Sequence, residues 1–139
     1  MYVDTSVAVK LYLSEPDSEA CEIIVAGNTL VSSRLLFCEF RSAILGKISR
    51  GMLPAESGPK VWQTFQDDVA ANKIRFVALN DMLVQDAADL LRELHPKVTL
   101  HTLDALHLAT YLSSESGPLF TKDGRMLQAA VHLGLPLAS

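Results

Sequence analysis

The sequence predicts an α/β fold in which a mostly parallel sheet is covered by helices on both faces. Short apolar runs that favour strands alternate along the chain with longer segments whose apolar residues recur at helical spacing. Strands that are joined through helices are usually parallel, because each helix returns the chain to the same end of the sheet. Two of the apolar runs also end at or beside an aspartate, Asp4 and Asp123, where open parallel sheets place their ligands.

Length and composition limit the classes of protein that fit. The chain has 139 residues, of which 49% are hydrophobic and 20% charged, so we expect a single domain over residues 1–139 with a substantial core. The net charge of −4 argues against a dedicated nucleic-acid binder with a basic surface, but not against a nuclease whose acids hold cations. No signal peptide or membrane span is recognisable, so a cytoplasmic protein is expected. Cys21 and Cys38 are predicted to be buried thiols rather than a disulfide.

Breaker and capping residues set the elements of the first half. The expected elements are strand 2–3, helix 7–13, helix 16–26, strand 29–32 and helix 34–50. The second helix has a proline at a favourable first position and should bury Ala20, Ile23 and Ile24. Ser33 can cap the long helix, and Gly51 can end it.

The second half repeats the alternation. The expected elements are helix 54–72, strand 74–79, helix 81–94, an extended segment 98–100, helix 103–112, strand 119–121, helix 126–133 and a short edge strand 135–137. Helix 54–72 has an apolar stripe that contains Trp62 and Phe65, and helix 81–94 alternates inward leucines with outward acids. Thr102 can cap helix 103–112, which is almost wholly apolar and should be buried on most sides.

Four acids stand in or next to apolar segments: Asp4, Glu39, Asp104 and Asp123. A carboxylate that enters a protein interior is costly unless it is paired, hydrogen-bonded or bound to a metal. Each has a simpler interpretation as well. Asp104 suits the positive end of a helix dipole, Glu39 can pair with the nearby Arg41, and Asp123 can bond its own backbone in a turn.

If the four acids converge, their charges require cations. Two like charges about 4 Å apart repel by about 4 kcal/mol at an effective dielectric constant of 20. All-oxygen ligand sets suit Mg²⁺ or Mn²⁺, and metals held in this way suit phosphodiester hydrolysis. Three short hydroxyl residues beside the acids, Thr5, Ser6 and Thr121, could orient carboxylates, water or phosphate.

Four motifs carry a resemblance to a known family. They are Val3-Asp4-Thr5-Ser6, Glu39 within its helix, Thr102-Leu103-Asp104-Ala105-Leu106-His107-Leu108-Ala109, and Phe120-Thr121-Lys122-Asp123-Gly124-Arg125-Met126. In these motifs and in their order the chain resembles the PIN-domain ribonucleases, and most closely the VapC-type toxins of toxin–antitoxin pairs. The likeness runs along the whole chain.

The resemblance implies an Mg²⁺- or Mn²⁺-dependent endoribonuclease on a Rossmann-like α/β/α fold. Asp4, Glu39, Asp104 and Asp123 match the catalytic quartet of the family. Asp4 and Asp104 would be the main metal ligands, Asp123 would add to them, and Glu39 would support the metals and the water. It also implies an RNA substrate, a homodimer and a cognate antitoxin whose C-terminal segment enters the acidic groove.

The histidines and the basic residues also have expected roles. His107 is interpreted as a helix-packing residue, and His101 as a candidate for RNA contact. Six basic residues could contact phosphates near the groove: Arg34, Arg41, Lys47, Arg50, Lys122 and Arg125.

The alternative function is a non-catalytic PIN-like module that scaffolds a protein or RNA partner. A phosphatase or receiver-type domain would also place aspartates at strand ends, but it requires further motifs that the sequence lacks.

Overall fold

The central sheet has four strands that all run parallel, in the order β3–β2–β1–β4. In the computed structural model, which describes residues 1–139, the strands are β1 Tyr2–Val3, β2 Leu30–Ser33, β3 Ile74–Val77 and β4 Leu119–Phe120. The register pairs Tyr2 of β1 with Val31 of β2 on one side and with Leu119 of β4 on the other. The predicted parallel α/β sheet is therefore confirmed.

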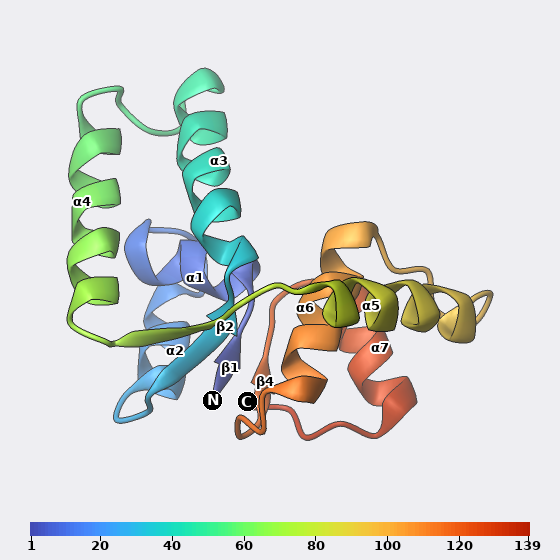
Figure 1. Cartoon of the computed structure of the whole chain (residues 1–139). Coiled ribbons are helices and arrows are strands. Elements are labelled where there is room, and N and C mark those ends of the chain that lie inside the picture. Colours follow the sequence, from blue (N-terminus) through green and yellow to red (C-terminus); the bar gives the residue numbers. More distant parts are fainter.

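Seven helices cover the two faces of this sheet (Figure 1). They are α1 Thr5–Tyr12, α2 Ser18–Val25, α3 Leu35–Ser49, α4 Ser57–Ala70, α5 Asp81–Leu94, α6 Thr102–Ser113 and α7 Gly124–Leu133. The two core clusters divide by face. Tyr2 and Val31 pack with residues of α5, α6 and α7, whereas Val3 and Leu30 pack with residues of α1 to α4. This division follows from the alternation of side chains along a strand.

Aromatic rings fill the space under the α3–α4 hairpin. Phe65 of α4 is fully buried, and its ring centroid lies 4.4 Å from that of Phe40 on α3 and 5.5 Å from that of Tyr12 on α1. The apolar stripe predicted for helix 54–72 therefore faces the core at Phe65. Trp62 is half-buried at the edge of the same cluster, with its ring 5.0 Å from that of Phe37.

Several element boundaries differ from the prediction. Helix α1 begins at Thr5 rather than at residue 7, because the side chain of Asp4 caps it by accepting from the backbone N–H of Val7. Thr102 is the first helical residue of α6, and His101 occupies the capping position instead. The edge strand predicted at 135–137 contributes only one bridge, between Leu119 and Leu137, whereas segment 98–100, predicted only to be extended, lies outside any helix or strand.

Side-chain burial also differs in places. On α2, Ile23 was predicted to be buried but is 69% exposed, whereas Cys21 is fully buried. The face of this helix that packs on the core is therefore the one that carries Cys21. Cys38 is exposed, although both cysteines are free thiols as expected. Leu103 and Leu112 are exposed, because α6 packs mainly against α5, α7 and β2 and keeps part of its surface free. None of the helices is both long and apolar enough to cross a membrane.

Candidate active site

Asp4 is the most deeply buried acid of the predicted quartet. It follows β1 directly, and only 4% of its surface is exposed. Its Oδ1 accepts hydrogen bonds from Ser6 Oγ at 2.6 Å and from the Val7 N–H at 3.2 Å, and its Oδ2 accepts from Thr121 Oγ1 at 2.5 Å. Burial raises the pKa of Asp4 above its usual range, and the hydroxyl donors offset part of that effect. No cationic side chain forms an ion pair with it.

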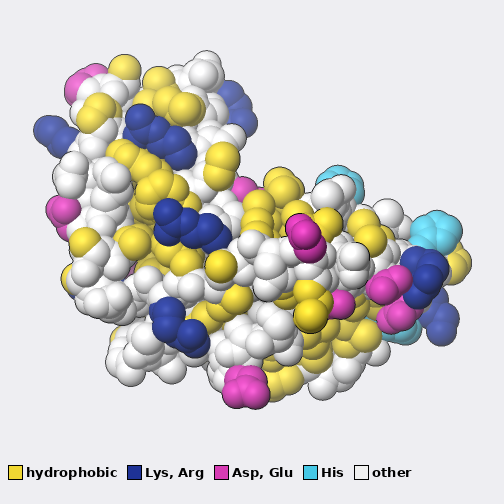
Figure 2. Space-filling model, viewed as in Figure 1, with side chains coloured by type: hydrophobic (Ala, Val, Ile, Leu, Met, Phe, Trp, Pro, Cys, Tyr) yellow, Lys and Arg dark blue, Asp and Glu magenta, His cyan; other side chains and the backbone are white.

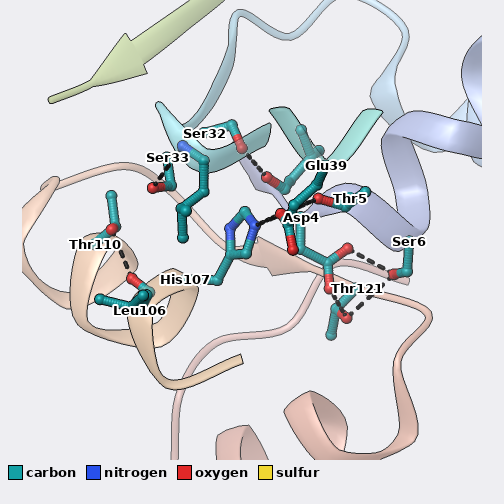
Figure 3. A network of polar contacts seen from close by, with 12 residues as sticks. Asp4, Thr5, Ser6, Ser32, Ser33, Glu39, Leu106, His107, Thr110 and Thr121 are labelled. Atoms are coloured by element: carbon teal, nitrogen blue, oxygen red, sulfur yellow. Dashed lines mark hydrogen bonds and ion pairs between the residues drawn. The ribbon is translucent and has the colours of Figure 1, made fainter. Parts of the chain in front are cut away.

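Two hydroxyl groups join the carboxyl ends of β1 and β4. Ser6 Oγ accepts a hydrogen bond from the Lys122 N–H at 2.8 Å, and Thr121 Oγ1 accepts from the Asp123 N–H at 3.0 Å. Because both hydroxyls donate to Asp4, they connect this carboxylate to the chain that leads into α7 (Figure 3). Ser6 and Thr121 therefore lie where the sequence predicted supporting residues.

Glu39 lies on α3 and has a partner that the sequence did not indicate. Its Oε2 accepts hydrogen bonds from Thr5 Oγ1 at 2.5 Å and from His107 Nε2 at 2.7 Å, and its side chain is 19% exposed (Figure 3). Burial alone would raise the pKa of Glu39, but the contacts with His107 and Thr5 lower it below its usual range. The alternative interpretation of Glu39, a local pair with Arg41, is wrong, because that guanidinium lies over the ring of Trp62 at 4.8 Å and forms no ion pair with Glu39.

His107 belongs to the polar site as well as to the core. It is buried, and its Nδ1 lies 2.9 Å from the Tyr2 hydroxyl, which also accepts from the Ser33 N–H at 3.2 Å. Burial raises the pKa of Tyr2 well above its usual range, so this phenol keeps its proton. The interpretation of His107 as a packing residue was incomplete. The available signal was its spacing of three residues from Asp104, which places both side chains on one face of α6.

Asp104 and Asp123 are helix-terminal carboxylates. Asp104 Oδ2 accepts from the His101 N–H at 2.9 Å in the first turn of α6. Asp123 caps α7, where its Oδ1 accepts from the N–H groups of Arg125 and Met126 at 2.8 and 3.0 Å. Both acids therefore make local contacts with backbone N–H groups at the start of a helix, in line with the simpler interpretation of each. Each acid is half-buried and retains one carboxylate oxygen that accepts no hydrogen bond from the protein.

The donor set can be compared with what a divalent cation needs. No group of three or more His, Cys, Asp and Glu side chains is arranged to hold one metal ion in this structure. However, Mg²⁺ usually keeps several waters and binds through only one or two carboxylates. Carboxylate oxygens and hydroxyls are the ligand types that Mg²⁺ and Mn²⁺ prefer, and a buried carboxylate without a cationic partner is a site that a cation would stabilise. The residues present therefore fit such an ion.

Comparison with known proteins gives matches over nearly the whole chain. The family model for the PIN domain matches residues 1–131. Ribonuclease VapC46 of Mycobacterium tuberculosis is 36% identical over 140 aligned residues, which cover 97% of this chain and 93% of that protein. Among solved structures, a toxin–antitoxin complex from Klebsiella pneumoniae has a chain that superposes with a TM-score of 0.57 at 16% identity, over 91% of this chain and 88% of that one.

Proposed function

Since this chain belongs to the PIN-domain family, we propose that it is a metal-dependent endoribonuclease and the toxin of a toxin–antitoxin pair. The observation that carries the proposal is Asp4, a buried carboxylate at the carboxyl end of a central parallel strand, hydrogen-bonded by neutral donors and not paired with any cation. Ligands of open parallel sheets bind at this end of the strands.

The proposed roles follow from what each carboxylate already contacts. Asp4 is held by Ser6 and Thr121, and we assign it to metal binding together with Asp104 and Asp123. Asp104 and Asp123 each have a free oxygen. No single ion is assigned all three carboxylates, because the structure does not arrange three such groups around one ion. Glu39 has Oε1 free and is assigned to water or metal. A divalent cation in such a site makes water more acidic and stabilises negative charge on phosphate oxygens.

Two arginines support RNA as the substrate. The Arg34 guanidinium lies 4.5 Å from the ring centre of Phe37 and 5.2 Å from that of Phe76, and Arg41 lies over Trp62. Neither arginine has an acidic partner, so both are available to phosphates. Figure 2 shows Lys and Arg side chains lying across hydrophobic ones on the face formed by α3 and α4.

The experiment is cleavage of a mixed cellular RNA pool by the purified full chain, with Mn²⁺ or Mg²⁺ and with EDTA. The Asp104→Asn variant is compared with Asp86→Asn, a control that removes an exposed carboxylate of α5. We expect discrete products that require metal and Asp104 but not Asp86. Cleavage that persists in EDTA, or in Asp104→Asn, would contradict the proposal. An absence of cleavage by folded protein would favour the non-catalytic scaffold.

The proposal includes two protein partners. A cognate antitoxin protein is proposed because the structural neighbour is part of a toxin–antitoxin complex, and co-expression with the neighbouring reading frame followed by co-purification tests it. A homodimer is supported by exposed apolar side chains, among them Met82 on α5 and Val131 on α7, and light scattering during gel filtration tests it. The cytoplasmic location expected from the sequence stays a prediction.

A further inference from the structure

The imidazole of His107 is buried, and each of its two nitrogens has a hydrogen-bond partner. Its Nδ1 lies 2.9 Å from Tyr2 Oη on β1, and its Nε2 lies 2.7 Å from Glu39 Oε2 on α3. Only 4% of the His107 side chain is exposed. Figure 3 shows the ring between the α6 ribbon and Glu39, so the histidine joins the helix that carries Asp104 to the helix that carries Glu39.

The direction of these hydrogen bonds follows from the carboxylate. An ionised carboxylate oxygen can only accept, so His107 Nε2–H donates to Glu39 Oε2 at 2.7 Å. A neutral imidazole that carries its proton on Nε2 accepts at Nδ1, and the Tyr2 hydroxyl donates there at 2.9 Å. The same hydroxyl oxygen accepts from the Ser33 N–H at 3.2 Å.

This arrangement restrains one oxygen of Glu39 and leaves the other free. Oε2 accepts from both His107 and Thr5, whereas Oε1 accepts no hydrogen bond from the protein. A glutamate side chain has three rotatable bonds, so a single hydrogen bond would allow the carboxylate to turn. Two donors on the same oxygen, one of them on a buried ring, fix the direction in which Oε1 points.

We propose that His107 is a positioning residue for Glu39, and that Tyr2 sets the histidine tautomer that makes this possible. The inference rests on the proposed ribonuclease function for its effect on catalysis, but the hydrogen-bond chain is a property of the protein alone. His107 touches neither substrate nor metal in this assignment and acts only through Glu39. Partners of this kind typically change activity by about 10- to 100-fold when they are removed.

A matched pair of variants separates positioning from packing. In His107→Gln the amide nitrogen lies near the place of Nε2 and can still donate to Glu39. In His107→Asn the amide group lies near the place of Nδ1 and cannot reach Glu39. We expect Asn to lower kcat by about 10- to 100-fold with KM nearly unchanged, and Gln to recover most of that loss. If both variants lose kcat equally at equal melting temperature, His107 is a packing residue and the proposal is wrong.

A double-mutant cycle tests whether His107 acts through Glu39. In the Glu39→Gln background the change His107→Asn should lower kcat no further, because the carboxylate that it positions is absent. Losses that multiply across the two sites would overturn the proposal.

The tautomer is measured without any activity. Nitrogen-15 NMR of the full chain, with labelled histidine, should find the His107 proton on Nε2 and an unprotonated Nδ1. Glu39→Gln should shift the Nε2–H resonance, because a charge-assisted hydrogen bond becomes a neutral one. A proton on Nδ1, or a resonance unmoved by Glu39→Gln, would overturn the assignment. This result holds even if the wild-type protein cleaves no RNA, so failure of the proposed function and failure of this inference are distinguishable.

Discussion

Thr121→Val removes one hydroxyl from the centre of the site while keeping the shape of the side chain. Thr121 is buried, donates to Asp4 Oδ2 at 2.5 Å and accepts from the Asp123 N–H at 3.0 Å. A hydrogen bond to a charged group contributes about 1.5 to 3 kcal/mol, and the N–H of half-buried Asp123 loses its acceptor as well. We therefore expect the free energy of unfolding to fall by about 2 to 4 kcal/mol.

The control is Thr110→Val, the same change at the other buried threonine. The Thr110 hydroxyl donates to the carbonyl of Leu106 one turn earlier in α6, a carbonyl that the helix already uses. Removing such a bond should cost less than about 1 kcal/mol. The assay is urea denaturation of the metal-free full chain at pH 7, followed by circular dichroism. Equal losses in the two variants would refute the reasoning, because the hydroxyl of Thr121 would then have no special role at Asp4.

Three further predictions use other parts of the structure. Asp4→Asn should raise the melting temperature in EDTA while abolishing cleavage, since burial raises the pKa of Asp4 and its ionised form opposes folding. This gain should grow as the pH rises above about 4, the ordinary pKa of an aspartate. A lower melting temperature for the variant in EDTA would contradict it. Glu15→Gln should destabilise the protein at pH 7, because contacts with Lys47 and Lys10 outweigh burial and lower the pKa of Glu15. The effect should disappear as the pH falls through that lowered pKa, and a urea series across pH 2 to 7 measures it. Phe65→Ala should cost about 3 to 5 kcal/mol in urea denaturation, because it empties the aromatic cluster under the α3–α4 hairpin; a loss below about 1 kcal/mol would show that the cluster collapses without cost.

The order of strands and helices could be predicted from the sequence because it depends on local patterns. Helix α5 has the predicted bounds, since an Asn80 cap and a regular stripe of leucines define both its start and its inward face. The helix-terminal contacts of Asp104 and Asp123 were predictable for the same reason, because a carboxylate reaches backbone N–H groups only a few residues away. Boundaries failed where a neighbouring segment decides pairing, as at Leu137, which meets Leu119 at only one bridge.

The partners of the buried polar groups were decided by tertiary structure. Arg41 is near Glu39 in the sequence and offers one possible partner, but the fold brings His107 to Glu39 across 68 positions and Tyr2 to His107 across 105. Thr121 reaches Asp4 across 117 positions because β4 lies beside β1 in parallel register. The physical reason is that the sequence states which groups need partners, whereas the register of the sheet and the packing of α6 determine which groups come within hydrogen-bond distance. The acids proposed for the site could thus be named from the sequence, whereas their hydrogen-bond partners depend on the parallel sheet and on the packing of α6.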